Sequence, residues 1–96
     1  MNLYLIHCGF YDNAICDGLY ESHVNYFVAA ESFDDARAKA KLIPEFKSKH
    51  MHVDGLQEIR SVDGYELNLK LNNELSNKTQ IVNFKHRDLA TKPAKS

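Results

Sequence analysis

The sequence predicts an α+β fold, a sandwich of one mixed sheet and one helix with the element order β-β-α-β-β. Three observations predict it: apolar and aromatic residues fill 2–10 and 23–30, a capped amphipathic stretch covers 32–43, and apolar and polar residues alternate over 65–71. The strands that flank the helix should run parallel through a right-handed crossover. The strand order stays open, because the first strand can pair with the second or with the third.

The first two segments are typical of strands. Residues 2–10 are apolar on both faces, which indicates a central strand. Residues 23–30, "HVNYFVAA", are rich in valine and aromatic residues. The stretch between them contains aspartate, asparagine and glycine, and is typical of a long irregular connection.

The helix over 32–43 has clear start and stop signals. Ser32 is a natural N-cap, and Asp35 follows three residues later, as in a capping box. Pro44 disfavours helical geometry at the residue before it and should end the helix. A stripe at helical spacing consists of Phe33, Ala36, Ala40 and Ile43.

The third strand is predicted within "HVDGLQEIRSV" (52–62), although its apolar residues come at every third position. A bulge near Gly55 would bring Val53 and Leu56 to the same face. Asp63-Gly64 then predicts a two-residue hairpin turn. In the fourth strand, 65–71, the side chains expected to face inward are Tyr65, Leu67, Leu69 and Leu71.

We expect one domain over 1–72, an extension over 73–85 and a disordered basic tail over 86–96. Within the extension, 79–84 is a candidate for a short fifth strand or an arm. Residues 1–72 carry a net charge of -4 and residues 73–96 carry +3. One helix covers one face of the sheet only, so the extension or a second subunit should cover the other, which predicts a homodimer.

Composition narrows the class of protein. The chain begins without a recognisable signal peptide and has no apolar run near the roughly 20 residues that span a membrane. We therefore expect a cytoplasmic protein with free thiols at Cys8 and Cys16 and without membrane partners. No phosphate-binding glycine motif is present. Nucleic-acid binding, which we do not expect, would depend on the basic residues of the extension and the tail, namely Lys78, Lys85, Arg87, Lys92 and Lys95.

Histidines and carboxylates should gather at one rim of the sheet. Glu21 and His23 begin the second strand, and His52 and Asp54 begin the third. If these strands are parallel neighbours, their starts lie at one edge, about 5 Å apart. This set can bind a divalent metal, with His23, His52 and Asp54 as the candidate ligands.

Two arguments favour a structural role for this rim. Histidines at strand ends often pair with carboxylates, and ligands of open α/β sheets favour the carboxyl ends of parallel strands, whereas this rim is their amino end. The end of the first strand adds His7 and Cys8, which point to opposite faces and cannot form a nucleophilic dyad with each other. His50 alternates with His52 but more naturally belongs to the preceding basic loop.

Four short motifs follow one another along the chain: a strand that begins at His23, the helix start around Ser32, the "HVD" of His52 to Asp54, and the "VDGY" that ends at Tyr65. Together they resemble a bacterial family catalogued as domain of unknown function 1543. The resemblance covers roughly residues 21–71, and Leu56 stands where such proteins often have a tryptophan. Members carry one or two copies of the unit, so the resemblance implies that two single-copy chains pair. It implies no activity.

The sequence thus favours a small non-enzymatic module that associates with itself and binds a protein or a small ligand. We expect no cofactor other than a divalent metal. Two alternatives from other classes stay open: a metal-binding protein that uses the His/Asp rim, and a weak nucleic-acid binder that uses the basic tail.

Overall fold

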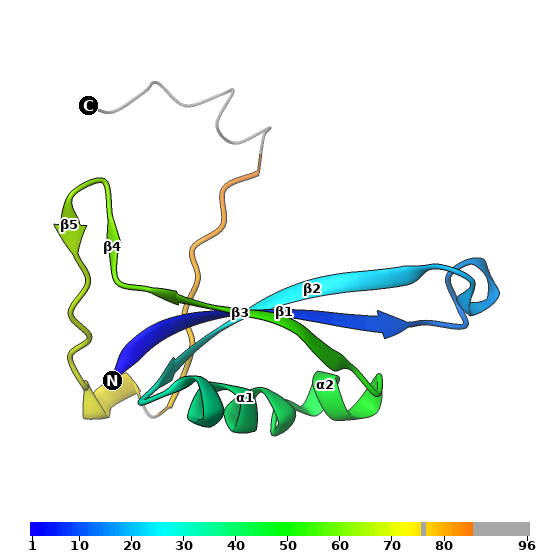
Figure 1. The fold of residues 1–96 in the computed structure, drawn as a ribbon, viewed down its shortest axis with the longest axis horizontal. Coiled ribbons are helices and arrows are strands. Elements are labelled where there is room, and N and C mark those ends of the chain that lie inside the picture. Colours follow the sequence, from blue (N-terminus) through cyan, green and yellow to red (C-terminus); the bar gives the residue numbers. More distant parts are fainter. Residues whose placement is uncertain (76, 86–96) are drawn as a thin grey trace.

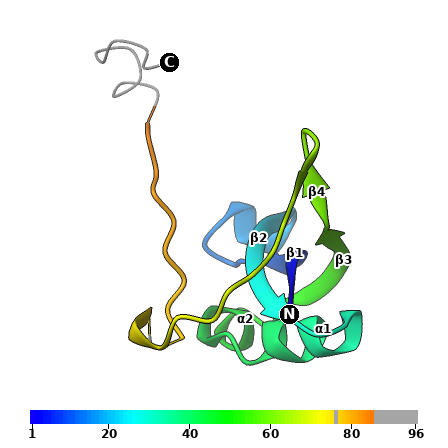
Figure 2. The same cartoon turned by 90° about the vertical axis from the view of Figure 1, so that its left-hand side faces the viewer.

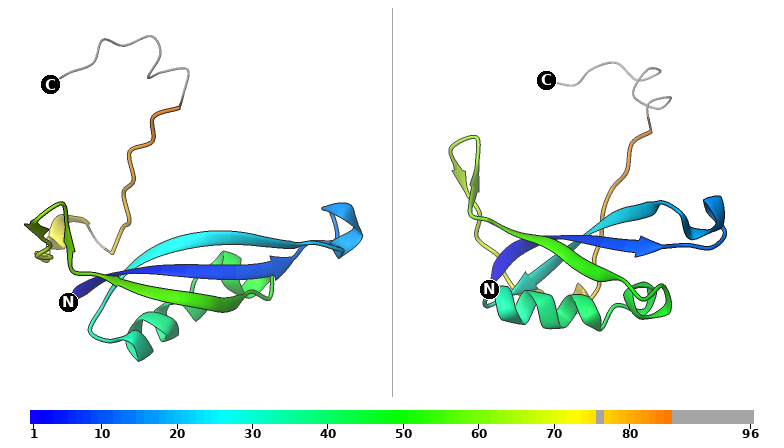
Figure 3. Two further views of the ribbon diagram at one scale, coloured as in Figure 1. Left: turned by 45° about the horizontal axis from the view of Figure 1, so that its top comes forward. Right: turned by 45° about the vertical axis from the view of Figure 1, so that its right-hand side comes forward.

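The core of the fold is a three-stranded sheet in the order β2-β1-β3, seen in the computed structural model, which describes residues 1–75 and 77–85 (Figure 1). The strands are β1 (Asn2–Tyr11), β2 (Glu21–Ala30) and β3 (His52–Ile59). β1 is antiparallel to both neighbours, as the left view of Figure 3 lets the reader follow. The predicted α+β class and the central position of the first strand are confirmed.

The expected adjacency of the second and third strands is wrong. β2 and β3 run in the same direction, as the crossover predicts, but β1 lies between them. The main sheet is therefore antiparallel rather than mixed. The physical reason is that β1 is a ten-residue apolar strand with two free edges, and each edge takes one partner.

Helix α1 (Phe33–Lys41) begins as predicted. The Ser32 hydroxyl oxygen accepts a hydrogen bond from the Asp35 backbone N–H at 3.1 Å. Pro44 ends this helix and begins a second one, α2 (Pro44–Ser48), which the sequence did not predict. Proline suits the first helical position because its fixed φ matches the helix and its missing N–H would have no partner there.

Both helices pack on one face of the sheet (Figure 2). Alternate side chains of β1 point toward them and are buried, namely Tyr4, Ile6, Cys8 and Phe10. Ala36 and Ala40 are fully buried, and these small residues let α1 lie close to the strands. The expectation that β1 is buried on both faces is wrong, because within the described residues no layer covers its other face and Leu3 and Leu5 remain half-exposed.

The register of β3 shifts by one residue opposite the step from His7 to Cys8. This irregularity confirms the bulge predicted near Gly55. Val53 pairs with Cys8 and Leu56 with Ile6, so both apolar residues face the helices.

The Asp63-Gly64 turn is also confirmed. It joins β4 (Ser61–Val62) to β5 (Tyr65–Glu66), and both turn residues have positive φ, 51° and 83°. The hairpin rises on the side of the sheet away from the helices (Figures 1 and 2).

The predicted fourth strand ends after two residues. Leu67, Leu69 and Leu71 follow β5 as exposed chain, so the expectation that they face inward is wrong. Alternation indicates only that one side of a segment is apolar, and here the pairing with β4 ends at Glu66, so no ladder continues into these leucines. No strand forms in 77–85 either, and the tail over 86–96 lies outside the described residues.

Three further features complete the fold. A short 3-10 turn, η1 (Cys16–Gly18), lies in the β1–β2 connection, and another, η2 (Asn73–Leu75), follows the exposed segment. Cys8 and Cys16 are both free thiols. Among the described residues, no helix is long and apolar enough to cross a membrane.

Candidate functional site

A cluster of histidines and carboxylates lies on the open face of the sheet, near the end of β1. Gly9 of β1 pairs with His23 on one side and with His52 on the other. Strands are about 4.8 Å apart, so side chains of β2 and β3 must reach inward across roughly 10 Å to meet. They meet above Gly9.

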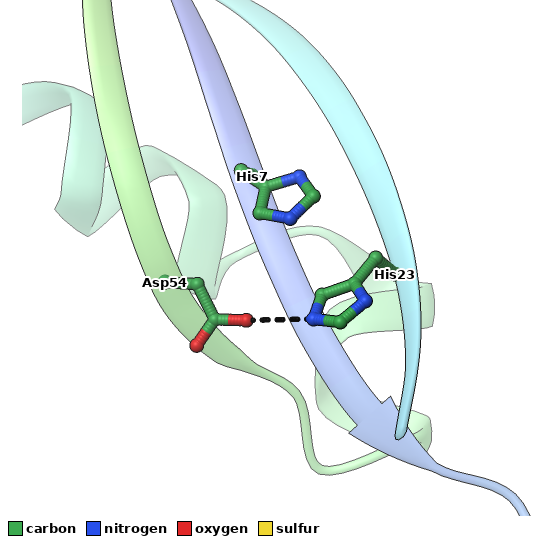
Figure 4. Close-up of side chains that lie close together, drawn as sticks. All are labelled: His7, His23 and Asp54. Carbon is green, nitrogen blue, oxygen red and sulfur yellow. Dashed lines mark ion pairs between the residues drawn. The ribbon is translucent and has the colours of Figure 1, made fainter. Parts of the chain in front are cut away.

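Four side chains form a closed ring there, in which each histidine contacts both carboxylates. His23 Nε2 lies 2.5 Å from Glu21 Oε1 and 3.2 Å from Asp54 Oδ2. His52 Nε2 lies 3.0 Å from Asp54 Oδ1 and 3.6 Å from Glu21 Oε2. Figure 4 shows the His23–Asp54 contact, which spans the width of β1.

The ring has more N···O contacts than the Nε2 hydrogens of His23 and His52 can convert into hydrogen bonds. Each imidazole carries at most one hydrogen on Nε2, and this hydrogen is directed at a single acceptor. Two such hydrogens cannot satisfy four N···O contacts. A cation could replace the missing hydrogens, with the imidazole nitrogens and the carboxylate oxygens as its ligands.

The distances suit a tetrahedral metal ion. Zinc binds nitrogen and oxygen at about 2.0–2.1 Å, so two ligand atoms of a tetrahedral site lie about 3.3 Å apart. Three of the four contacts, 3.0, 3.2 and 3.6 Å, lie close to this value, whereas the His23–Glu21 contact of 2.5 Å would have to lengthen. The four side chains are 28% to 47% exposed, so an ion can enter from solvent.

Gly9 makes the convergence of these donors sterically possible. A Cβ at this position would lie 2.6 Å from Asp54 Oδ2, 2.6 Å from Glu21 Oε1 and 2.7 Å from His52 Nε2. Real Cβ atoms essentially never approach other atoms so closely. The missing side chain therefore leaves the space in which the donor atoms gather, as is typical of a strand glycine at a point of close approach.

The carboxylates are held in place by the local strand geometry. Glu21 pairs with Tyr11 at the end of the β1–β2 ladder. Burial alone would raise the pKa of Glu21, but hydrogen bonds from Tyr11 and His23 outweigh it and hold that pKa below its ordinary value. The same hydrogen bond to Glu21 raises the pKa of Tyr11. Glu21 is therefore an anion at neutral pH.

Asp54 is the extra residue of the β3 bulge. Gly9 pairs with His52 and Cys8 with Val53, but His7 pairs with Gly55, so Asp54 has no partner across the ladder. Bulges commonly redirect a side chain next to a functional site. Here the bulge places Asp54 on the open face together with His52, within reach of His23 on the far strand.

All four residues of the predicted rim, Glu21, His23, His52 and Asp54, come together in the structure. They lie on the open face of an antiparallel sheet rather than along its rim, so the rule about carboxyl ends of parallel strands does not apply to them. His50 lies in the turn after α2 with φ of 51° and belongs to neither group of metal-ligating side chains found among the described residues.

Cys8 is separated from this cluster. It points toward the helices, is fully buried, and has a pKa raised by that burial, so it is not a thiolate next to these histidines. Gly9 and Tyr11 were not predicted from the sequence. A glycine inside an otherwise apolar strand was the signal that could have identified Gly9.

A family model described as Domain of Unknown Function (DUF1543) matches residues 18–69, more than half of the chain. The chain belongs to this family. The resemblance predicted from the sequence is thereby confirmed, and the matched segment contains all four residues of the ring, whereas His7 and Gly9 precede it. No curated protein and no solved structure matches the chain.

Proposed function

We propose that this DUF1543 protein binds a divalent transition metal ion, zinc above all, through Glu21, His23, His52 and Asp54. The observation that supports it best is the ring of four N···O contacts above Gly9, whose lengths resemble the ligand–ligand distances of a tetrahedral site. Two imidazoles with two carboxylates suit zinc better than magnesium or calcium, which prefer oxygen ligands alone.

The electrostatics support a dication rather than a purely structural ion-pair cluster. The two carboxylates bring their oxygens to a space where each imidazole offers at most one hydrogen, so four N···O contacts share two hydrogens. A dication would balance the charges of the carboxylates and would also tie β2 to β3 across β1. In a chain of 96 residues whose described part covers one face of the sheet, such a cross-link is expected to add stability.

The test is zinc binding by protein purified without a histidine tag, measured by competition with a chromophoric chelator and by the zinc-induced shift in melting temperature. His52→Asn should weaken zinc binding at least about 100-fold. His50→Asn is the matched control, because His50 is two residues away, outside the ring, and asparagine tolerates its positive φ. Unchanged affinity in His52→Asn, or no zinc binding by the natural protein, would refute the proposal.

A second function, self-association, is supported by the face of the sheet opposite the helices. Phe27 on this face is 44% exposed, and the segment after β5 exposes Leu69 and Leu71, which are 42% and 83% exposed. A second copy is the partner that fits best, because the charge of -4 over 1–72 complements the +3 over 73–96.

Sedimentation equilibrium tests this second proposal. The natural protein should dimerise with increasing concentration, and Leu69→Ser should weaken the dimer while Asn68→Ser, one position away, leaves it unchanged. A protein that stays monomeric at high micromolar concentration would rule out self-association and leave metal binding unaffected.

A further inference from the structure

His7 lies beside the four-residue ring but is not part of it. It is two residues before Gly9 on the same face of β1, and its ring stacks on that of His23 with 4.7 Å between centroids and 9° between planes. Figure 4 shows the His7 ring beside the space between Asp54 and His23, with one ring nitrogen turned toward them.

A hydrogen bond prepares His7 as a ligand. Its Nδ1 lies 2.7 Å from the Asn25 side-chain oxygen, which can only accept, so Nδ1 carries the hydrogen. Nε2 is then the ring nitrogen that can offer a lone pair to a metal ion. Metal-binding histidines typically donate their other ring N–H to an oxygen in this way, which fixes the tautomer and the ring orientation.

The donor atoms fall into two overlapping groups. His7, His23 and Asp54 offer one set of atoms within 4.8 Å of one another, and Glu21, His52 and Asp54 offer another. Asp54 belongs to both. Its Oδ2 lies toward His23 and its Oδ1 toward His52.

Glu21 divides its oxygens in the same manner. Oε1 lies 2.5 Å from His23 Nε2, and Oε2 lies 3.6 Å from His52 Nε2. Each carboxylate thus presents one oxygen to each histidine of the ring. This is the arrangement in which carboxylates bridge two metal ions about 3.5–4 Å apart.

We propose that the cluster holds two divalent metal ions, with Asp54 and Glu21 as bridging ligands. One ion is bound by His7 and His23, the other by His52, and each takes one oxygen from each carboxylate. This inference rests on the proposed metal-binding function and extends it. Three imidazole nitrogens and four carboxylate oxygens are seven donor atoms, whereas one tetrahedral ion uses four.

The two ions differ in the number of protein ligands. The ion at His7 and His23 has four, and the ion at His52 has three, which leaves a coordination position for water. Two ions with four positive charges against two carboxylates leave the loaded site positive. Such a pair of bridged ions is the arrangement with which two-metal hydrolases activate water.

Metal stoichiometry tests the proposal. Equilibrium dialysis against zinc, followed by elemental analysis, should give two ions per chain for the natural protein. His7→Phe keeps a ring to stack on His23 but has no ring nitrogen. This variant should bind one ion, and the affinity for the ion at His7 and His23 should fall at least about 100-fold. His50→Asn is the control and should bind two.

A second readout reports whether the ions share a ligand. With Mn²⁺ in place of zinc, electron paramagnetic resonance should show exchange coupling in the natural protein and an uncoupled single ion in His7→Phe. One ion per chain in both proteins would overturn the two-ion site and leave the metal-binding function standing. No bound ion in either would overturn both proposals, and two ions in His7→Phe would overturn the role of His7.

Discussion

Gly9→Ala tests the role of the space above β1 separately from that of the metal ligands, because the substitution changes none of the ligands. The added Cβ would lie 2.6 to 2.7 Å from three donor atoms, whereas ordinary contact begins near 3.4 Å. Each donor must therefore retreat by about 0.8 Å. Metal sites tolerate deviations of about 0.2 Å in ligand distance. We expect zinc affinity to fall at least about 100-fold.

The fold should tolerate this substitution. The three atoms that the Cβ meets are the ends of partly exposed side chains, which can turn outward. Alanine loses less conformational entropy than glycine in a strand, a difference of roughly 0.5–1 kcal/mol. Without zinc, Gly9→Ala should therefore melt at the same temperature as the natural protein or slightly higher.

The assay is a thermal melt with and without zinc. At a zinc concentration about 100 times the dissociation constant, binding stabilises the natural protein by roughly 2.7 kcal/mol. In a domain of this size that corresponds to a rise of roughly 10–20 °C. If the variant binds 100-fold more weakly, the gain at the same concentration falls to about 0.4 kcal/mol, a rise of roughly 2–3 °C.

Gly55→Ala is the matched control. Gly55 also lies in a strand on the open face, but a Cβ there would meet nothing within 4 Å. It should keep the full zinc-induced shift. A Gly9→Ala protein that keeps this shift would refute the reasoning, because the donors would then not need the space above Gly9.

Two further predictions concern the helices. Ser32→Ala should lower the free energy of unfolding by about 1 kcal/mol through loss of the cap to the Asp35 N–H, measured by urea denaturation, while Ser32→Asp should restore most of it; equal loss in both variants would contradict the capping role. The Tyr26 hydroxyl donates to Glu45 of α2 and is the largest cause of the lowered pKa of that carboxyl. Because the pKa of Glu45 is lower in the folded protein than in the unfolded one, this hydrogen bond contributes fully to stability above the unfolded pKa, and its contribution is lost as pH falls through the folded pKa. The difference in free energy of unfolding between the natural protein and Tyr26→Phe should therefore be full at pH 6–7 and shrink below about pH 4. A difference that stays constant from pH 7 to pH 3 would contradict this assignment.

Several of the features that the sequence predicted correctly are local ones. The Ser32 cap, the stop at Pro44 and the Asp63-Gly64 turn each depend on residues a few positions apart, which a sequence pattern states directly. The predicted length of the fourth strand was wrong, because alternation indicates only that one side of the segment is apolar. It does not indicate that other side chains are present to bury that side. Strand order was left open for a similar reason: an apolar strand such as β1 accepts a partner at either edge.

The proximity of the four residues was predicted from a partly wrong premise, and the reason they still come together is topological. The prediction depended on β2 and β3 being neighbours, with their starts adjacent. In fact both strands are antiparallel to β1. Their starts therefore lie at the same end of the sheet, one on each side of the last residues of β1. Placing β1 between them doubles the distance that the side chains must span, and only a residue without a side chain at the middle position lets them meet.

Gly9 and Asp54 therefore belong to one structural solution. The glycine in the central strand opens the space, and the bulge in β3 adds the one residue that lets Asp54 reach His23 while Val53 and Leu56 keep their places against the helices. A regular β3 of the same sequence would move either Val53 or Leu56 to the solvent face, because a shift of one residue reverses every side chain. The core thus requires the bulge, and the cluster on the open face uses the residue that the bulge leaves unpaired.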